Sequence, residues 1–270
     1  MWKGAVSFGL VNVPIKMFTA TENKSVKFRN LHKDCNTPIK YQRVCPNCER
    51  EVESEEIVRG YEYQKGTFVV INDEDIEAIP NENTKSIDIM DFVNLKDIDP
   101  VFFDKTYYLA PEETGKKAYN LLTEALSKTK RVAVAKVVIR SKESLVAIRV
   151  YKGTLVLETM HFPDEVRNVK EVPGVGEKVK VSDNELDMAK ELIEKLSAKF
   201  DPEKYTDEYR NQLMSLIEQK VQGKEIAQPK AKRDDSVVDL MEALESSLNA
   251  VKKEAVTSSN KKKPRKKKTG

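Results

Sequence analysis

The sequence predicts a mainly β protein with appended α-helices, in which a β-barrel occupies residues 1–181. Up to that point most apolar residues lie in short runs separated by turn residues, with one helical segment among them. Many short strands joined by short turns are typical of a barrel. From residue 182 the apolar residues recur with helical spacing, and the last nineteen residues are rich in lysine.

The first predicted element is a strand over residues 5–18, where apolar and polar residues alternate. The alternation changes phase at Gly9, which predicts a bulge or bend there. Pro14 places the strand near an edge or at the bend, because proline cannot donate a ladder hydrogen bond. The same reasoning predicts a hairpin and two further short strands at 57–71, 87–95 and 106–110.

A helix and a three-strand meander complete the predicted barrel. Residues 113–128 have apolar residues at helical spacing. The runs that follow alternate again and are separated by two short turns, which predicts strands over 131–140, 144–151 and 154–160.

Three helices are predicted after the barrel. Ser182 with Glu185 three residues later forms a capping box that begins the first. The second begins at Thr206 and ends near Gly223. The third follows a short linker and carries one clean apolar stripe, formed by Val237, Leu240, Met241, Leu244, Leu248 and Val251. Residues 252–270 are low in complexity and cationic, so we expect them to be disordered.

Charge is unevenly distributed along the chain. The last nineteen residues carry nine Lys or Arg and one Glu, a net charge of +8. The whole chain carries +3, so residues 1–251 sum to −5 (+3 less +8). Such a tail favours polyanion binding through counterion release, although a solubility tail or a nuclear-type address has a similar composition.

The body of the chain is segregated as well. Residues 24–50 carry a net charge of +5, residues 51–101 of −10, and residues 126–152 of +7. The blocks either neutralise one another within the molecule, or the two basic blocks line one polyanion-binding surface while the acidic block faces away.

No run of 18 apolar residues is present, so the sequence predicts no membrane span. The amino terminus lacks an apolar signal segment, which makes the cytoplasm the expected compartment. The three cysteines fall within fourteen residues. An odd, clustered set argues against a disulfide framework and favours a metal site or free thiols.

The metal candidates are His32, Cys35, Cys45 and Cys48. Each pair is separated by two residues, and nine residues lie between the pairs. Two such pairs suit a tetrahedral zinc ion, and four protein ligands would make the zinc structural and not catalytic. Reduced free thiols or a vestigial site are the alternatives.

Signals for catalysis are weak. Neither a phosphate-binding loop nor a nucleophile elbow is present. Two functions therefore compete with simple polyanion binding by the basic blocks. One is a zinc-ribbon nucleic-acid-binding or transcription factor. The other is a nuclease that uses acidic residues within 73–104.

Several motifs together resemble the bacterial Ku proteins of non-homologous end joining. The opening run Trp2–Lys16 (WKGAVSFGLVNVPIK) is the longest of them. The others, in order along the chain, lie at 57–63, 107–111, 155–160, 164–167, 207–210 and 238–244. Each motif is weakly specific alone, but the set covers essentially the whole chain.

The resemblance implies a homodimeric ring around double-stranded DNA ends, without catalytic activity of its own. Its implied partner is the multifunctional ATP-dependent end-joining ligase of the ligase D type, and its implied location is the nucleoid. It also implies a Ku-like barrel core over 1–181 with a DNA-encircling arch at about 24–60. A helical arm (182–226), a linker with a partner-binding helix (227–251) and the basic tail (252–270) follow.

Candidate phosphate contacts follow from the ring, which needs backbone contacts and no base readout. In the arch and barrel they are Lys33, Lys40, Arg43, Lys130, Lys136, Arg140, Lys142 and Arg149. In the tail they are Lys261, Lys262, Lys263, Arg265, Lys266, Lys267 and Lys268. The apolar stripe of the third helix is the candidate ligase-binding surface, with packing on the dimer as the alternative.

Overall fold

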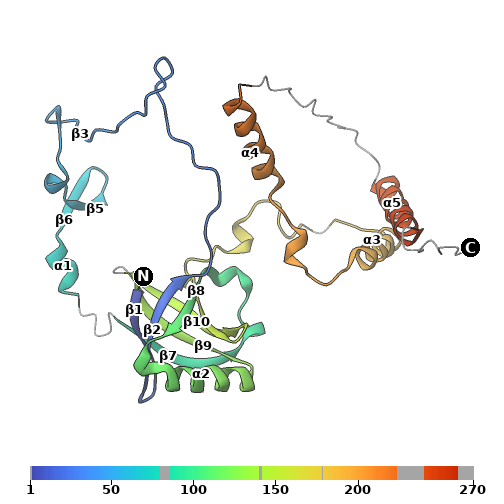
Figure 1. Ribbon diagram of the computed structural model, residues 1–270, viewed down its shortest axis with the longest axis horizontal. Coiled ribbons are helices and arrows are strands. Elements are labelled where there is room, and N and C mark those ends of the chain that lie inside the picture. The colour runs from blue at the N-terminus through green and yellow to red at the C-terminus, as the bar shows by residue number, and fades with distance from the viewer. Residues whose placement is uncertain (1, 80–84, 140–141, 178, 224–239, 261–270) are drawn as a thin grey trace, which may run out of the picture. The chain divides into compact units, whose positions relative to one another are not determined.

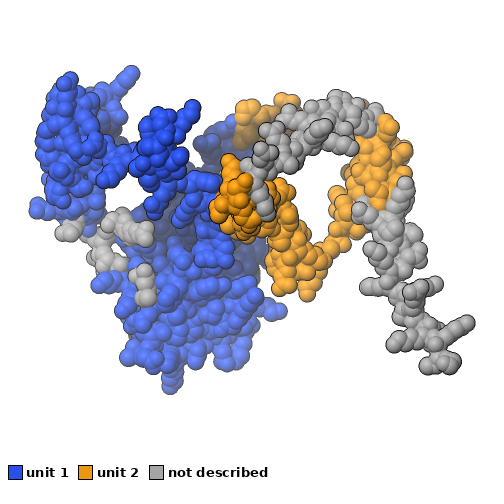
Figure 2. All heavy atoms as spheres, turned by 45° about the horizontal axis from the view of Figure 1, so that its top comes forward, with its two compact units in different colours: residues 1–171 blue, residues 172–270 orange. Residues whose placement is uncertain are grey.

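The computed structural model describes residues 2–79, 85–139, 142–177, 179–223 and 240–260. The chain forms two compact units, Met1–Glu171 and Val172–Gly270, which are coloured separately in Figure 2. Each unit is described by itself below. Within the described ranges, no helix combines the length and the apolar content that crossing a bilayer requires.

The first unit contains a closed seven-stranded barrel (Figure 1), with the strands in the order β1-β2-β8-β11-β10-β9-β7. The strands are β1 (Trp2–Phe8), β2 (Val11–Thr19), β7 (Ser86–Asn94), β8 (Phe103–Pro111), β9 (Arg131–Ile139), β10 (Lys142–Tyr151) and β11 (Thr154–Met160). The meander, the helix beside it and the mainly β class with appended helices are thereby confirmed.

The start of the chain differs from the prediction. Residues 2–19 form a hairpin and not one bent strand, with Phe8 paired to Val11 across a two-residue turn. Gly9 has a φ of +59°, the left-handed conformation that such a turn requires and that glycine adopts at little cost. The change of phase at Gly9 therefore marks a reversal of the chain.

Closure of the barrel depends on one parallel pair, in which Val6 of β1 lies opposite Ile87 of β7. The backbones come close there, since a Cβ on Gly4 would lie 2.3 Å from the carbonyl oxygen of Lys85. Alternate residues of the strands fill the interior. The fully buried ones include Val6, Val13, Ile15, Ile87, Leu109, Ile148, Leu155 and Leu157.

One end of the barrel is covered by α2 (Lys116–Thr129), which contributes Tyr119, Leu122 and Leu126 to the core. The hydroxyl of Tyr119 lies between two neighbouring strands. It donates to the carbonyl oxygen of Leu109 (2.7 Å) and accepts from the amide of Leu155 (2.9 Å). The helix is thereby tied to β8 and β11 by hydrogen bonds as well as by apolar packing.

Residues 20–85, called the insert below, connect β2 to β7. The insert contains two small hairpins: β3 (Val44–Cys45) with β4 (Arg50–Glu51), and β5 (Arg59–Gln64) with β6 (Thr67–Ile71). The second hairpin confirms the strand pair predicted for 57–71. The short helix α1 (Asp73–Glu77) follows it.

Among its described residues, the second unit contains three α-helices: α3 (Asp183–Leu196), α4 (Glu208–Val221) and α5 (Leu240–Asn260). Ser182 forms the predicted capping box with Glu185. α4 begins two residues after the predicted Thr206, with Asp207 as its N-cap. α5 continues to Asn260, so residues 252–260, which we expected to belong to the disordered tail, are helical.

Candidate nucleic-acid interface

Two of the candidate barrel cations are paired with carboxylates. The Lys136 Nζ lies 2.8 Å from the Glu143 carboxylate on the neighbouring strand. The Lys142 Nζ lies 3.2 Å from Glu165. All four side chains remain at least a third exposed, so water screens these ion pairs and each contributes little to stability. A phosphate would have to compete with the carboxylate for either lysine.

Arg149 is held more firmly. Its guanidinium makes two hydrogen bonds to Glu158, of 3.0 and 2.5 Å, and the two side chains are only 26% and 10% exposed. These hydrogen bonds raise the pKa of Arg149. The guanidinium also lies 5.6 Å from the ring centre of Tyr151. The geometry indicates a structural role for Arg149, and a phosphate would have to displace Glu158 to reach its guanidinium.

The remaining barrel candidates differ. Lys130 follows the last turn of α2 in the left-handed conformation, with a φ of +55°, and is exposed. Arg140 lies outside the described residues, as do the tail candidates Lys261, Lys262, Lys263, Arg265, Lys266, Lys267 and Lys268.

The insert contributes three of the described candidate cations. Lys33, Lys40 and Arg43 are all exposed. Arg43 donates a hydrogen bond of 3.4 Å to the Ser54 hydroxyl, which leaves its charge unneutralised. The exposed Tyr41 lies among them, and its hydroxyl accepts from the Asn30 amide at 2.7 Å. This basic segment can therefore present several cations to one polyanion.

The four candidate metal ligands form two pairs with the same local turn. The amide of Asn36 donates to the carbonyl oxygen of His32, and that of Glu49 donates to Cys45, each at 2.8 Å. Asn36 and Glu49 both have left-handed backbone, with φ of +54° and +52°. The His32 Nδ1 lies 3.1 Å from the Cys35 Sγ.

The surroundings of the three cysteines shift their pKa values in different directions. A hydrogen bond from the Thr37 hydroxyl lowers the pKa of Cys35. The amides of Cys48 and Asn47 lower the pKa of Cys45, whereas the neighbouring Cys45 raises that of Cys48. Across the described part of the chain, no three His, Cys, Asp or Glu side chains lie close enough together to hold a metal ion. The structure thus forms two half-sites of suitable donor chemistry that are not brought together.

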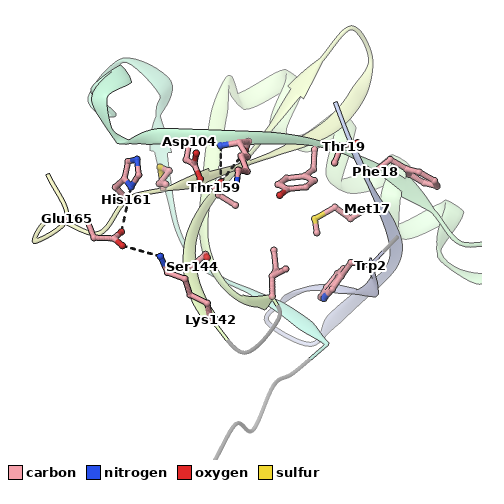
Figure 3. Close-up of a pocket in the computed structure, with 14 residues that line it drawn as sticks. Trp2, Met17, Phe18, Thr19, Asp104, Lys142, Ser144, Thr159, His161 and Glu165 are labelled. Carbon is pink, nitrogen blue, oxygen red and sulfur yellow. Dashed lines mark hydrogen bonds and ion pairs between the residues drawn. The ribbon is translucent and has the colours of Figure 1, made fainter. Parts of the chain in front are cut away.

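The end of the barrel opposite α2 contains a cavity of about 770 Å³ (Figure 3). Trp2 and Met17 point into it, and Lys142, His161 and Glu165 lie at its edge. The amide of Phe162 and the side chain of Lys142 lower the pKa of Glu165. His161 lies 3.7 Å from Glu165, so it belongs to this surface network.

The candidate partner-binding stripe is partly covered within the chain. α5 packs against α3, and Leu248 is only 6% exposed, while Met241 and Leu244 are half-buried. Leu240 is exposed. Val237 lies outside the described residues.

Sequence reasoning missed the carboxylate that holds Arg149. A usable signal was present, because the Lys152-Gly153 turn places Arg149 opposite Val156. Glu158 is two residues further along the same face of the partner strand, within reach of a long side chain.

The comparisons with known proteins agree with this barrel. Residues 7–188 match the Ku family model, described as the Ku70/Ku80 beta-barrel domain. The Non-homologous end joining protein Ku of Heliobacterium modesticaldum is 49% identical over 270 residues, which cover 100% of this chain and 98% of that protein. The protein of the same name from Bacillus subtilis is 47% identical over 94% of this chain and 82% of its own length.

A third relative, from Archaeoglobus fulgidus, carries the same name. It is 41% identical over 93% of this chain and 98% of its own length. Since the family model covers more than half of the chain and the relatives align over nearly all of it, the chain belongs to the Ku family.

Proposed function

We propose that this protein binds the ends of double-stranded DNA without sequence preference, as a ring-shaped homodimer, and recruits an end-joining ligase during double-strand-break repair. The observation that carries the proposal is the alignment of nearly the whole chain with relatives named for non-homologous end joining. The protein acts by binding and has no catalytic step of its own. Its place of action is the nucleoid in the cytoplasm.

Charge supports the proposal independently of the relatives. The exposed Lys33, Lys40 and Arg43 lie in a segment of net charge +5, and the carboxyl-terminal nineteen residues add +8. Contacts to phosphate give affinity without reading bases. We assign the phosphate contacts first to these cations and to Lys130, ahead of the carboxylate-paired Lys136 and Lys142.

Binding of one duplex in linear and covalently closed circular form, at matched length and near-physiological salt, tests the proposal. A ring threads only onto ends, so we expect strong preference for the linear form. Blocking both ends after binding should trap the protein on the DNA. Equal affinity for the two forms would show a basic DNA-binding protein that does not encircle DNA.

We also propose that His32, Cys35, Cys45 and Cys48 hold one structural zinc ion. The support is the donor set together with the repeated turn, which presents two donors from each pair in the same way. Zinc would stabilise the insert by joining its two half-sites. Metal analysis of purified protein should find one zinc per chain, and Cys45→Ser should lower that content while Ser25→Ala should not. A zinc-free wild-type protein that binds DNA ends normally would contradict this assignment.

Ligase recruitment is assigned to α5. Leu240 is the described stripe residue most open to a partner, whereas Leu248 is covered by packing on α3. Leu240→Glu should therefore weaken ligase binding in a titration of the full chain. Leu121→Glu, at an exposed position of α2, is the matched control. Equal loss in both variants would argue against α5 as the docking element.

A further inference from the structure

The hairpin β5–β6 in the insert lacks the packing that a two-stranded sheet needs. Two strands alone are marginally stable in water. This hairpin nevertheless exposes apolar side chains on both faces: Tyr61 (67%) and Val69 on one, and Phe68 (61%) with Val70 on the other. Among the described residues, β5 is the only strand paired with β6. The hairpin therefore requires a partner outside the packing described so far.

The two edges of the hairpin are not equivalent. β5 carries Arg59 and Glu62, and its register is interrupted between Glu62 and Gln64, where Tyr63 is the extra residue. Charges and bulges both protect an edge from pairing. β6 (Thr67–Ile71) has the sequence TFVVI, with no charge, no proline and no register shift of its own. Its free edge is the one suited to receiving another strand.

We propose that β6 pairs antiparallel with β6 of a second copy of this chain, joining the two inserts by a four-stranded sheet. A two-fold axis at Val69 places Phe68 opposite Val70 of the second copy and Thr67 opposite Ile71. Aromatic and β-branched residues form favourable cross-strand pairs. The Tyr61 and Val69 surfaces of the two copies become one continuous apolar face. The inference rests on the homodimer proposed above and names the surface that closes it.

Charge at the strand ends favours the same arrangement. In the register centred on Val69, the β5–β6 turn of one copy, which carries Lys65, comes next to the start of α1 of the other, which begins at Asp73. Glu74 and Asp75 follow directly, and all three acids are exposed. Asp73 already lies 3.2 Å from the Arg59 Nη1, so Lys65 would join an exposed ion pair. Because the axis is two-fold, the contact occurs twice.

Photo-crosslinking tests the pairing directly in the full-length protein bound to a linear duplex. A p-benzoylphenylalanine is placed at Phe68, with Leu121 on α2 as the control position. Mixing copies with and without heavy nitrogen separates crosslinks between copies from those within one. We expect mixed-isotope crosslinks from position 68 to residues 67–71, and none of that kind from position 121.

A charge exchange provides the second measurement. Lys65→Glu should reduce the crosslink yield roughly five-fold, since two attractive contacts become repulsive. Adding Asp73→Lys should restore it, and Lys96→Glu, the same change on the barrel, should leave it unchanged. Light scattering on the same samples separates the possible failures. A dimer without crosslinks from position 68 would overturn the β6 pairing alone, whereas a monomer would overturn the homodimer itself.

Discussion

Tyr119→Phe removes a hydroxyl on which two buried backbone groups depend. The hydroxyl lies 2.7 Å from the Leu109 carbonyl oxygen and 2.9 Å from the Leu155 amide nitrogen, and it also lies 2.8 Å from the Thr154 hydroxyl. Only 5% of Tyr119 is exposed, so water has little access to replace it. The substitution leaves the apolar packing of the ring in place, so it isolates the hydrogen bonds.

The expected loss follows from the groups left unpaired. A buried donor or acceptor without a partner costs about 1–3 kcal/mol. Two such groups, with partial relaxation of the strands, should lower the free energy of unfolding by about 3 kcal/mol. For a chain of this size each kcal/mol lowers Tm by about 2–4 °C. We therefore expect Tm to fall by roughly 6–12 °C.

Urea unfolding of the full chain, followed by circular dichroism, measures this change. The wild type and the variant must be compared at one protein concentration, because self-association links stability to concentration. Tyr108→Phe, at a partly exposed position of β8, is the matched control and should change stability by less than about 0.5 kcal/mol.

An unchanged stability for Tyr119→Phe would refute the reasoning. Leu109 and Leu155 are already partners in the register of β8 and β11. If the two strands can close and bond directly, the hydroxyl is not needed. The free energy of unfolding would then stay within about 0.5 kcal/mol of the wild type, at the same dependence on urea.

Three further predictions concern the carboxyl-terminal side of the barrel, the arm and the tail. The Phe162 amide and Lys142 lower the pKa of Glu165. The ionised carboxylate therefore stabilises its turn fully at pH values above the ordinary carboxyl pKa of 4.5, and this contribution is lost as the pH falls through the lowered pKa. The Phe162 amide resonance should titrate below that value in the wild type and not in Glu165→Gln. Ser182→Ala should destabilise α3 by about 1 kcal/mol, seen as faster hydrogen exchange in α3 but not in α4. Deleting 261–270, which removes seven Lys or Arg, should lower the slope of log affinity against log salt by about 0.9 per lost contact; an unchanged slope would exclude the tail from DNA.

Local patterns predicted the elements well where the signal was itself local. Ser182 with Glu185 identified the start of α3, and the turn at Lys152-Gly153 fixed the β10–β11 hairpin. The turn at Gly9 was mistaken for a bulge, because both features shift the alternation by one residue. Only the pairing of Phe8 with Val11 distinguishes them.

The site was less predictable because its decisive contacts join distant residues. Nothing near Val6 in the sequence indicates that it pairs with Ile87. Similarly, a count of cations cannot separate the exposed Lys33 from Arg149, whose charge is neutralised by Glu158. The predicted end of the third helix failed for another reason: residues 252–260 contain Lys, Glu and Ala, which favour helix as readily as a soluble tail.

The pairing of β1 with β2 and β7 determines where the two ends of the insert leave the barrel. Met17 near the end of β2 lies opposite Trp2, and Ser86 at the start of β7 lies opposite Ala5, so both ends of the insert leave the barrel at the end that bears the cavity. β2 and β7 flank β1 on either side, so the two strands that bear the insert are about 10 Å apart across the barrel wall. The entropy of closing such a loop grows only with the logarithm of its length, at about 0.6 kcal/mol per doubling. Evolution can therefore lengthen, shorten or replace this segment while the barrel beneath keeps its stability.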